Sequence, residues 1–314
     1  MAAYRSGKVR ETMFDWAAGH VADNNHIHHY GCVVPNYRPG VSLDGVGNRC
    51  THNLIHHSLH QAIAFGGNDQ YIGFNVLHDL CRFNDDAGSI YCCQRDWTKR
   101  GTVIEHNLIH MTGKQPRATH TEAVYLDDFS SGIVVRGNLI NRATLGVHIG
   151  GGQDCVVERN VFMNCGQGAS IGSRGIDSFA REIALKGHRS GMFTRLESLR
   201  PLLESELWRT RYPKLLKVYD FSDAQFAHNA LYNVVSNNVL AGCGGLSVSN
   251  RKNIEAFTTV TNNLEIAGNP GFEDYFNFGW NLQTNTLAYK LVGELCFSEM
   301  GLYDSPLRVS PAVK

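Results

Sequence analysis

The chain has 314 residues, of which 43% are hydrophobic and 18% are charged. This composition excludes an intrinsically disordered chain and a charged coiled coil. Lysine plus arginine and aspartate plus glutamate are equal in number, at 29 each. The balanced charge gives no electrostatic footprint for nucleic acid, and no apolar run approaches the roughly 18 residues of a membrane span. We therefore expect neither nucleic acid nor a membrane as a partner.

The first 20 residues lack the apolar stretch of a secretory signal peptide. The sequence as it stands predicts a cytoplasmic protein, and a secreted or periplasmic one if its N-terminus has been trimmed. The nine cysteines form no CxxC pair and show no regular metal-ligand spacing. We interpret them as reduced, structural residues, with a disulfide or a redox role as the alternative, and we expect no cofactor.

A short segment built around an asparagine recurs six times. It reads NNHIHH, HNLIHH, FNVLHD, HNLIHM, GNLINR and RNVFMN, and its asparagines are Asn25, Asn53, Asn75, Asn107, Asn138 and Asn160. Two further β-rich segments accompany it in each unit, and at 22 to 32 residues per repeat this pattern is typical of a β-solenoid. We predict an all-β fold, a right-handed parallel β-helix (a pectate-lyase-like solenoid), in which asparagines of successive coils hydrogen-bond at a corner.

The repeat pattern divides the chain into four parts. We expect an N-terminal cap at 1–20, coils that carry the active site at 21–175, a helical insertion at about 176–217, and the last coils with a C-terminal covering segment at 218–314. The insertion has apolar residues at helical spacing, and residues 174–217 carry a local excess of five positive charges. We favour a solvated insertion packed on the solenoid, with a lid over an anionic substrate as the alternative. A homodimer or another partner is the alternative to the cap at the first coil.

Aromatic side chains line up when the second strands of successive coils are aligned on their inward aliphatic residues. This alignment places Tyr91, Tyr125 and His148 side by side on an outward face. Aromatic rings offer stacking platforms for sugars, and nearby carboxylates bind hydroxyl groups. The pattern therefore predicts a sugar-binding groove on this face.

Two pairs of carboxylates flank the same strands. Asp85 and Asp86 precede one strand, and Asp127 and Asp128 end the next. Coils stack about 4.8 Å apart, so carboxylates of adjacent coils can reach the separations of glycosidase pairs, about 5–5.5 Å in retaining and about 6.5–9.5 Å in inverting enzymes. We interpret the pairs as catalytic, with simple turn chemistry as the alternative.

His28, His56, His78 and His110 occupy equivalent positions in four successive coils. Histidine is a common metal ligand, so a metal site is one interpretation. We favour the other, a stack of like residues at equivalent solenoid positions, and accordingly predict no metal.

The segments DDAGSIYCCQRDWTKRGTVIEHNLIH, AVYLDDFSSGIVVRGN and VHIGGGQDCVVERNVFMNC resemble a bacterial family of carbohydrate-active parallel β-helix proteins, and are most similar to glycoside hydrolase family 141. With RYPKL, NPGFED and MGLY, the resemblance covers most of residues 50–305. It implies α-L-fucosidase-like or xylanase-like activity on plant cell-wall saccharides, with Asp86 and Asp127 as the catalytic pair. The chain departs from the family in having only about two coils before Asp86 and in placing Cys92 and Cys93 in the groove floor.

The leading hypothesis is therefore a glycoside hydrolase in which one of Asp86 and Asp127 is the general acid and the other the nucleophile or base. Its predicted substrate-binding residues are Tyr91, Arg95, Asp96, Trp97, His120, Glu122, Tyr125, Asp128 and His148.

Two other hypotheses remain open. A polysaccharide lyase would need a base and a group that neutralises a uronate, and Arg95, Lys99, Arg100, His120 and Tyr125 are candidates. The paired aspartates argue against a lyase, because carboxylates repel an anionic substrate. The third hypothesis is a non-catalytic carbohydrate-binding or structural solenoid.

Overall fold

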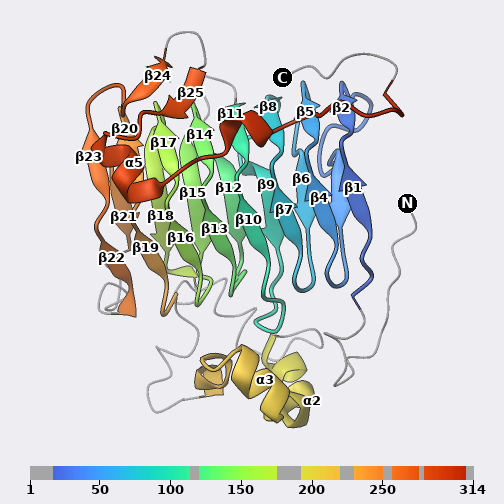
Figure 1. Cartoon of the computed structure of the whole chain (residues 1–314). Coiled ribbons are helices and arrows are strands. Elements are labelled where there is room, and N and C mark those ends of the chain that lie inside the picture. The colour runs from blue at the N-terminus through green and yellow to red at the C-terminus, as the bar shows by residue number, and fades with distance from the viewer. Residues whose placement is uncertain are drawn as a thin grey trace.

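The computed structural model describes residues 17–113, 120–174, 192–219, 230–249, 257–275 and 279–308. Most of the expected N-terminal cap, and residues 176–191 of the expected insertion, lie outside this part. Within it the chain winds as a stack of coils, each of which contributes one strand to each of three long parallel sheets (Figure 1).

The first sheet has eight strands and the order β1-β4-β7-β10-β13-β16-β19-β22. Their bounds are β1 (Val21–Asp23), β4 (Arg49–Thr51), β7 (Tyr71–Gly73), β10 (Val103–Glu105), β13 (Val134–Arg136), β16 (Val156–Glu158), β19 (Val234–Ser236) and β22 (Thr259–Thr261). The second sheet also has eight strands and the order β2-β5-β8-β11-β14-β17-β20-β23. Their bounds are β2 (His26–His28), β5 (Leu54–His56), β8 (Val76–Leu80), β11 (Leu108–Thr112), β14 (Leu139–Asn141), β17 (Val161–Met163), β20 (Val239–Ala241) and β23 (Leu264–Ile266).

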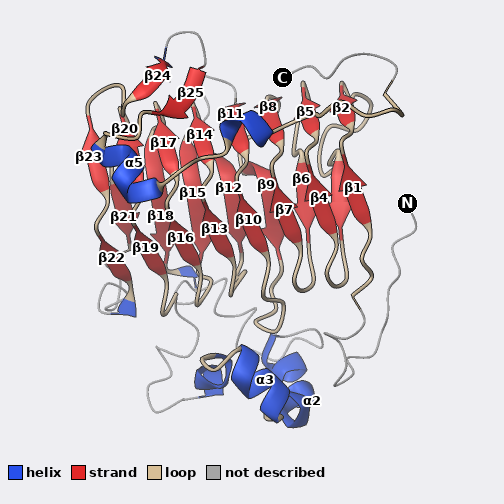
Figure 2. Cartoon of the chain, in the orientation of Figure 1, coloured by secondary structure: helices blue, strands red, loops and turns tan. Residues whose placement is uncertain are grey.

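The third sheet has seven strands, and every neighbouring pair is parallel. They are β3 (Val41–Leu43), β6 (Ile63–Phe65), β9 (Ala87–Cys93), β12 (Thr121–Asp127), β15 (Leu145–Gly150), β18 (Gln167–Gly172) and β21 (Leu246–Val248). This architecture confirms the predicted right-handed parallel β-helix. Figure 2 shows how little of it is helical.

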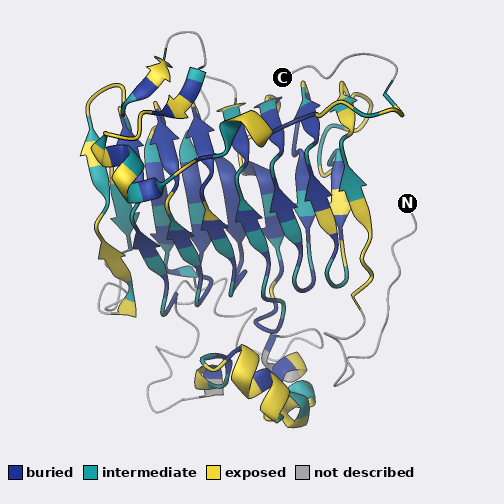
Figure 3. Ribbon diagram, in the orientation of Figure 1, coloured by how far each residue is buried: buried dark blue, intermediate teal, exposed yellow. Residues whose placement is uncertain are grey.

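The interior of the β-helix is an apolar core. Most strands of the first and second sheets contribute their middle residue to it, whereas the short strands β3 and β6 of the third sheet contribute their first and third residues. On the first sheet, Ile72 pairs with Cys50 and Ile104 in register, and all three are fully buried. Such alternation of inward and outward side chains is the period of two expected of a strand. Figure 3 shows the resulting buried interior along the stack of coils.

A ladder of asparagines runs along the corner between the first and second sheets. The Nδ2 group of each asparagine donates to Oδ1 of the next at 2.9–3.0 Å, and the same oxygen accepts the backbone N–H of the preceding rung. This confirms the predicted amide-to-amide contacts. Beyond Asn160 the ladder skips the insertion and continues through Asn238 and Asn263.

The outward face of the second sheet is covered by the C-terminal segment. Leu54, Val76, Leu108, Leu139 and Val161 form one buried apolar cluster with residues of that segment, including Trp280 and Met300. The segment comprises β24 (Phe272–Asp274), β25 (Gly279–Leu282), α5 (Leu287–Val292) and the 3₁₀ turn η5 (Phe297–Glu299). It runs back from the last coils to the first, where the backbone N–H of Tyr303 donates to Asn24 (Figure 1).

The described part of the helical insertion contains α2 (Met192–Leu203), α3 (Glu206–Arg211) and the 3₁₀ turn η2 (Leu215–Tyr219). These helices enclose an apolar cluster with Trp97 and Phe129, which belong to the corners that follow β9 and β12. The insertion therefore packs on the solenoid beside the third sheet. None of the helices in the described ranges is long and apolar enough to cross a membrane.

Candidate active site

The outward face of the third sheet carries the aromatic residues that the sequence aligned. Tyr125 pairs in register with Tyr91 on one side and His148 on the other. The Tyr125 ring centroid is 5.4 Å from each of the other two rings, in edge-on geometry. Tyr125 is fully buried, so its ring does not offer the predicted stacking face to a sugar, whereas Tyr91 and His148 are half-buried and form the exposed part of this aromatic floor.

Each of the two tyrosines hydrogen-bonds to the aspartate of the other coil. Tyr91, on β9, donates to Oδ2 of Asp127 at 3.1 Å. Tyr125, on β12, donates to Oδ1 of Asp86 at 3.1 Å. Asp86 immediately precedes β9 and Asp127 ends β12, so this crossed pairing draws the two carboxylates from opposite ends of adjacent strands toward the same ring pair.

Arg174 connects the two carboxylates, and sequence reasoning did not identify it as a site residue. Its Nη2 group donates to the Tyr125 hydroxyl at 3.0 Å and lies 3.2 Å from Oδ1 of Asp127. With the 3.1 Å contact between Tyr125 and Asp86, these contacts form one continuous path. Oδ1 of Asp86 and Oδ1 of Asp127 therefore lie no farther apart than the summed length of these three contacts, about 9.3 Å. This upper limit is compatible with the separations of both retaining and inverting glycosidases.

Two glycines make room for Arg174. A Cβ atom at Gly150 would lie 3.3 Å from Nε of Arg174, and one at Gly151 would lie 2.9 Å from its Cβ. Gly151 also has a φ of +80°, a backbone conformation that favours glycine. The corner that begins with Gly150 and Gly151 thus leaves the space in which Arg174 approaches Asp127.

The two aspartates sit in different environments. Asp127 is buried, and burial together with the neighbouring Asp128 raises the pKa of its carboxyl group, against the opposing effects of Arg174 and Tyr91. Asp86 is exposed. A carboxyl with a raised pKa retains a proton more readily, which suits a general acid, whereas an exposed carboxylate suits a nucleophile or base.

Asp128 is held by two arginines. Its Oδ2 accepts from Nε of Arg95 at 2.7 Å and its Oδ1 from Nη1 of Arg174 at 2.9 Å. Cys93, Asp127 and Asp128 each offer one atom to a possible metal site, all within 4.8 Å. The site fits a metal poorly, because both carboxylates are already paired with guanidinium groups and burial raises the pKa of the Cys93 thiol to about 12.

A second acidic group lies beside this site. Nδ1 of His120 is 2.7 Å from Oε1 of Glu122. The pairing raises the pKa of His120, and burial raises that of Glu122. Burial lowers the pKa of His148 to about 3, so its ring is neutral at ordinary pH. His120 is exposed, and it forms the rim with Asp86 and Arg95.

Trp97 and Asp96, predicted to bind sugar, do not line this face. Trp97 is only 1% exposed and packs against Phe129 beneath the insertion. Asp96 caps its own turn by accepting from Thr98, and its Oδ2 lies 2.8 Å from Nε of Arg195 on α2. The prediction failed because these two residues belong to the corner that anchors the insertion, and periodicity within the coils does not show where an insertion packs.

One candidate of the lyase hypothesis is also elsewhere. Arg100 is fully buried, donates to the carbonyl of Trp97, and pairs with Asp154 at 3.1 Å.

The sequence contains a pattern that indicates Arg174 as a site residue. Arg174 follows β18 at the same corner at which Arg95 follows β9, but its charge was grouped with those of the insertion. Equivalent corner positions are a better guide to the site than local charge.

No protein-family model matches the chain, and no curated protein matches it either. The resemblance to glycoside hydrolase family 141 therefore stays a prediction. Among solved structures the chain is similar to a double mutant of the tailspike protein of E. coli bacteriophage HK620 in complex with a pentasaccharide, at 13% identity and a TM-score of 0.43. The match covers 77% of this chain and 38% of the tailspike chain, so this chain spans less than half of the length of that protein.

Proposed function

We propose that the protein is a glycoside hydrolase, with Asp127 as the general acid and Asp86 as the nucleophile or base. The observation that carries the proposal is the crossed pair of hydrogen bonds, Tyr91 to Asp127 and Tyr125 to Asp86. It joins two aspartates of unlike burial around one aromatic floor. Two carboxyl groups in contrasting environments are the central requirement of glycoside hydrolysis.

In the proposed reaction the Asp127 carboxyl gives its proton to the glycosidic oxygen as the bond to the anomeric carbon breaks. Asp86 completes the step in one of two ways. It takes a proton from the attacking water, or it bonds to the anomeric carbon and is released by water, whose proton returns to Asp127. In the second case both carboxyl groups end each cycle as they began it, and in the first the proton returns through solvent.

The surrounding residues support both roles. Burial and the nearby carboxylates raise the pKa values of Tyr91 and Tyr125, so both hydroxyls keep their protons and donate. Arg174 lies within 3.2 Å of Asp127 and contacts the tyrosine that binds Asp86, and it positions the pair. Exposed His120 and Arg95 at the rim are placed to hydrogen-bond sugar hydroxyls.

The lyase alternative is weaker on the same geometry. A lyase needs a cation free to neutralise a uronate, whereas Arg95 and Arg174 are both paired with Asp128. Arg100, another candidate, is buried against Asp154.

The test is incubation with plant and algal saccharides, including xylans and fucose-containing polysaccharides, followed in two channels. We expect new reducing ends without the ultraviolet absorbance of an unsaturated uronate. Asp86→Asn and Asp127→Asn should each lower the rate roughly 10²- to 10⁴-fold, and Asp85→Asn, an exposed neighbour of Asp86, should have little effect.

Absorbance that rises together with the reducing ends would show a lyase instead. Saccharide binding without release of reducing ends would favour the non-catalytic solenoid. Full hydrolytic activity in both aspartate variants would contradict the assignment of the pair.

A further inference from the structure

A group of histidines gathers at one end of the second sheet, away from the candidate active site. We call it the histidine cluster; its members are His26, His28, His29, His56, His57 and His78. His28, His56 and His78 pair in register on β2, β5 and β8. Their rings stack at 5.2 and 4.6 Å, which confirms the predicted stacking of like residues. The sequence did not predict the members that lie beside this column.

A second column follows the first by one residue. His29, His57 and Asp79 each come directly after a stacked histidine and have φ values near +52°. The left-handed backbone at these positions turns each side chain back toward its neighbour. Nδ1 of His56 lies 2.6 Å from Nδ1 of His57, and Nδ1 of His78 lies 2.9 Å from Oδ2 of Asp79.

These contacts bring ring nitrogens together head to head. Nε2 of His56 is also 2.7 Å from Nε2 of His26, so His56 meets another imidazole at both of its nitrogens. Two neutral rings that meet in this way share one proton, and at least one nitrogen of each pair presents a lone pair to the other. Convergent nitrogen lone pairs are what a borderline metal ion binds.

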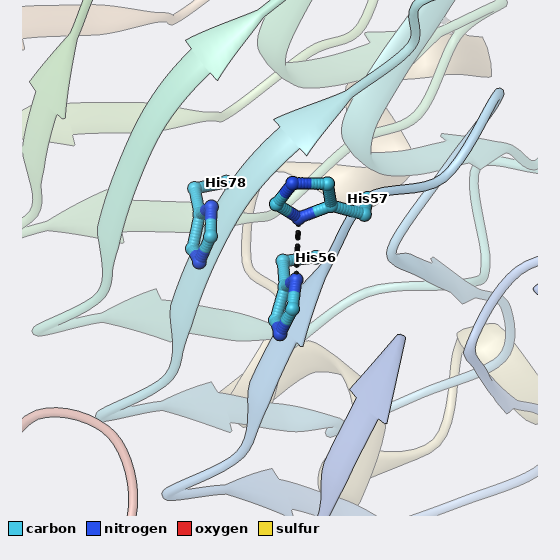
Figure 4. A group of neighbouring side chains, drawn as sticks. All are labelled: His56, His57 and His78. Carbon is cyan, nitrogen blue, oxygen red and sulfur yellow. Dashed lines mark hydrogen bonds between the residues drawn. The ribbon is translucent and has the colours of Figure 1, made fainter. Parts of the chain in front are cut away.

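We propose that His56, His57 and His78 bind a divalent transition-metal ion of the zinc type. One ligand nitrogen from each lies within 4.8 Å of the others. Figure 4 shows His57 facing the stacked rings of His56 and His78. Asp79 stands beside His78 and would offset part of the charge of the ion.

The His56–His57 pair needs little change to accept the ion, whereas the His78 ring, which stacks parallel to that of His56 at 4.6 Å, must turn its nitrogen toward them. Zinc–nitrogen bonds of about 2.0–2.1 Å at a tetrahedral angle separate two ligand nitrogens by about 3.3 Å. The pair formed by His56 and His57 would therefore open by less than about 1 Å, and the His57 side chain lies at the exposed surface. Three protein ligands leave a fourth position for water.

The site would tie two coils together. His56 and His57 belong to the coil of β5, whereas His78 belongs to the coil of β8. A bound ion would add a cross-coil link near the N-terminal end of the solenoid. An ion that binds only the folded chain also raises its stability.

The test uses the chain without a polyhistidine tag, treated with a chelator and dialysed. Titration calorimetry with Zn²⁺ should give one saturable site per chain, and thermal unfolding should move to higher temperature. Co²⁺ in the same site should give visible bands without the near-ultraviolet charge-transfer band of a thiolate ligand.

His57→Asn is the decisive variant, since asparagine tolerates the left-handed backbone at this position. Loss of the ligand should weaken Zn²⁺ binding at least about tenfold, because even the outer partners of metal ligands are worth about 10–100-fold. The matched control is His52→Asn, which removes a histidine of the same coil that lies outside the cluster and has the same left-handed backbone. It should leave Zn²⁺ affinity unchanged.

Absence of a saturable site, or unchanged affinity in a folded His57→Asn variant, would overturn the proposal and leave the cluster as stacked neutral rings. Binding that persists in His57→Asn, shows a thiolate band and disappears in Cys93→Ser would place the ion at the acidic site instead, and would overturn it equally.

Discussion

At the scale of single residues, two aspartates are suited to different roles because their surroundings differ. Asp127 lies in a buried position beside Asp128, and its pKa is raised. Asp86 lies on the exposed side of the same tyrosine pair. A difference in burial is a simple way to obtain an acid and a base from two identical residues.

Tyr91→Phe tests this difference through the pH dependence of the reaction. The Tyr91 hydroxyl donates to the Asp127 carboxylate, which stabilises the charged form and lowers the pKa of Asp127. Removing the hydroxyl should raise that pKa. Since a general acid acts while protonated, we expect the alkaline limb of kcat/KM to move to higher pH.

Tyr71→Phe is the matched control, because Tyr71 lies on the first sheet. It should leave the pH profile unchanged. A shift of the alkaline limb to lower pH in Tyr91→Phe would be incompatible with Asp127 as the acid.

At the scale of elements, the asparagine ladder fixes the register of the coils. Asn107 accepts from the backbone and side chain of Asn75, and it donates to the carbonyls of Ile72 and Glu105. These groups are buried, so they would remain unsatisfied if the amide were removed. The ladder therefore links successive coils by continuous hydrogen bonds along one corner and stabilises their register.

Asn107→Ala should lower the free energy of unfolding by roughly 1–3 kcal/mol for each buried group left without a partner. Asn25→Ala, at the exposed first rung, should cost less than about 1 kcal/mol, the net worth of an ordinary hydrogen bond. Urea unfolding followed by circular dichroism measures both. Equal losses in the two variants would argue against a buried ladder.

The insertion is a second element with its own anchor. Trp97 fills the apolar cluster between the corner after β9 and the helices α2 and α3. Trp97→Ala should cost about 3–5 kcal/mol, as for other buried large-to-alanine changes, and should make α2 and α3 more accessible to limited proteolysis. Trp97→Phe should show a smaller effect. An unchanged proteolysis pattern in Trp97→Ala would mean that the insertion is held elsewhere.

At the scale of the whole molecule, the features that repeat from coil to coil could be predicted from the sequence, whereas the packing of the insertion could not. Asn25 to Asn160 and the pair Tyr91 and Tyr125 recur at equivalent positions, so alignment alone predicted their stacking. Trp97 was misplaced and Arg174 was overlooked because both depend on where the insertion folds back. That packing is a contact between distant segments, and no period in the sequence encodes it.

The most direct test of the account compares two substrates that carry the same sugar. The first is the saccharide that the incubations with plant and algal saccharides identify as the substrate. The second is the dinitrophenyl glycoside of the same sugar, whose leaving group departs without protonation. We predict that Asp127→Asn loses activity on the saccharide but keeps most of it on the aryl glycoside, whereas Asp86→Asn loses both. Equal losses of Asp127→Asn on the two substrates would contradict its role as the general acid.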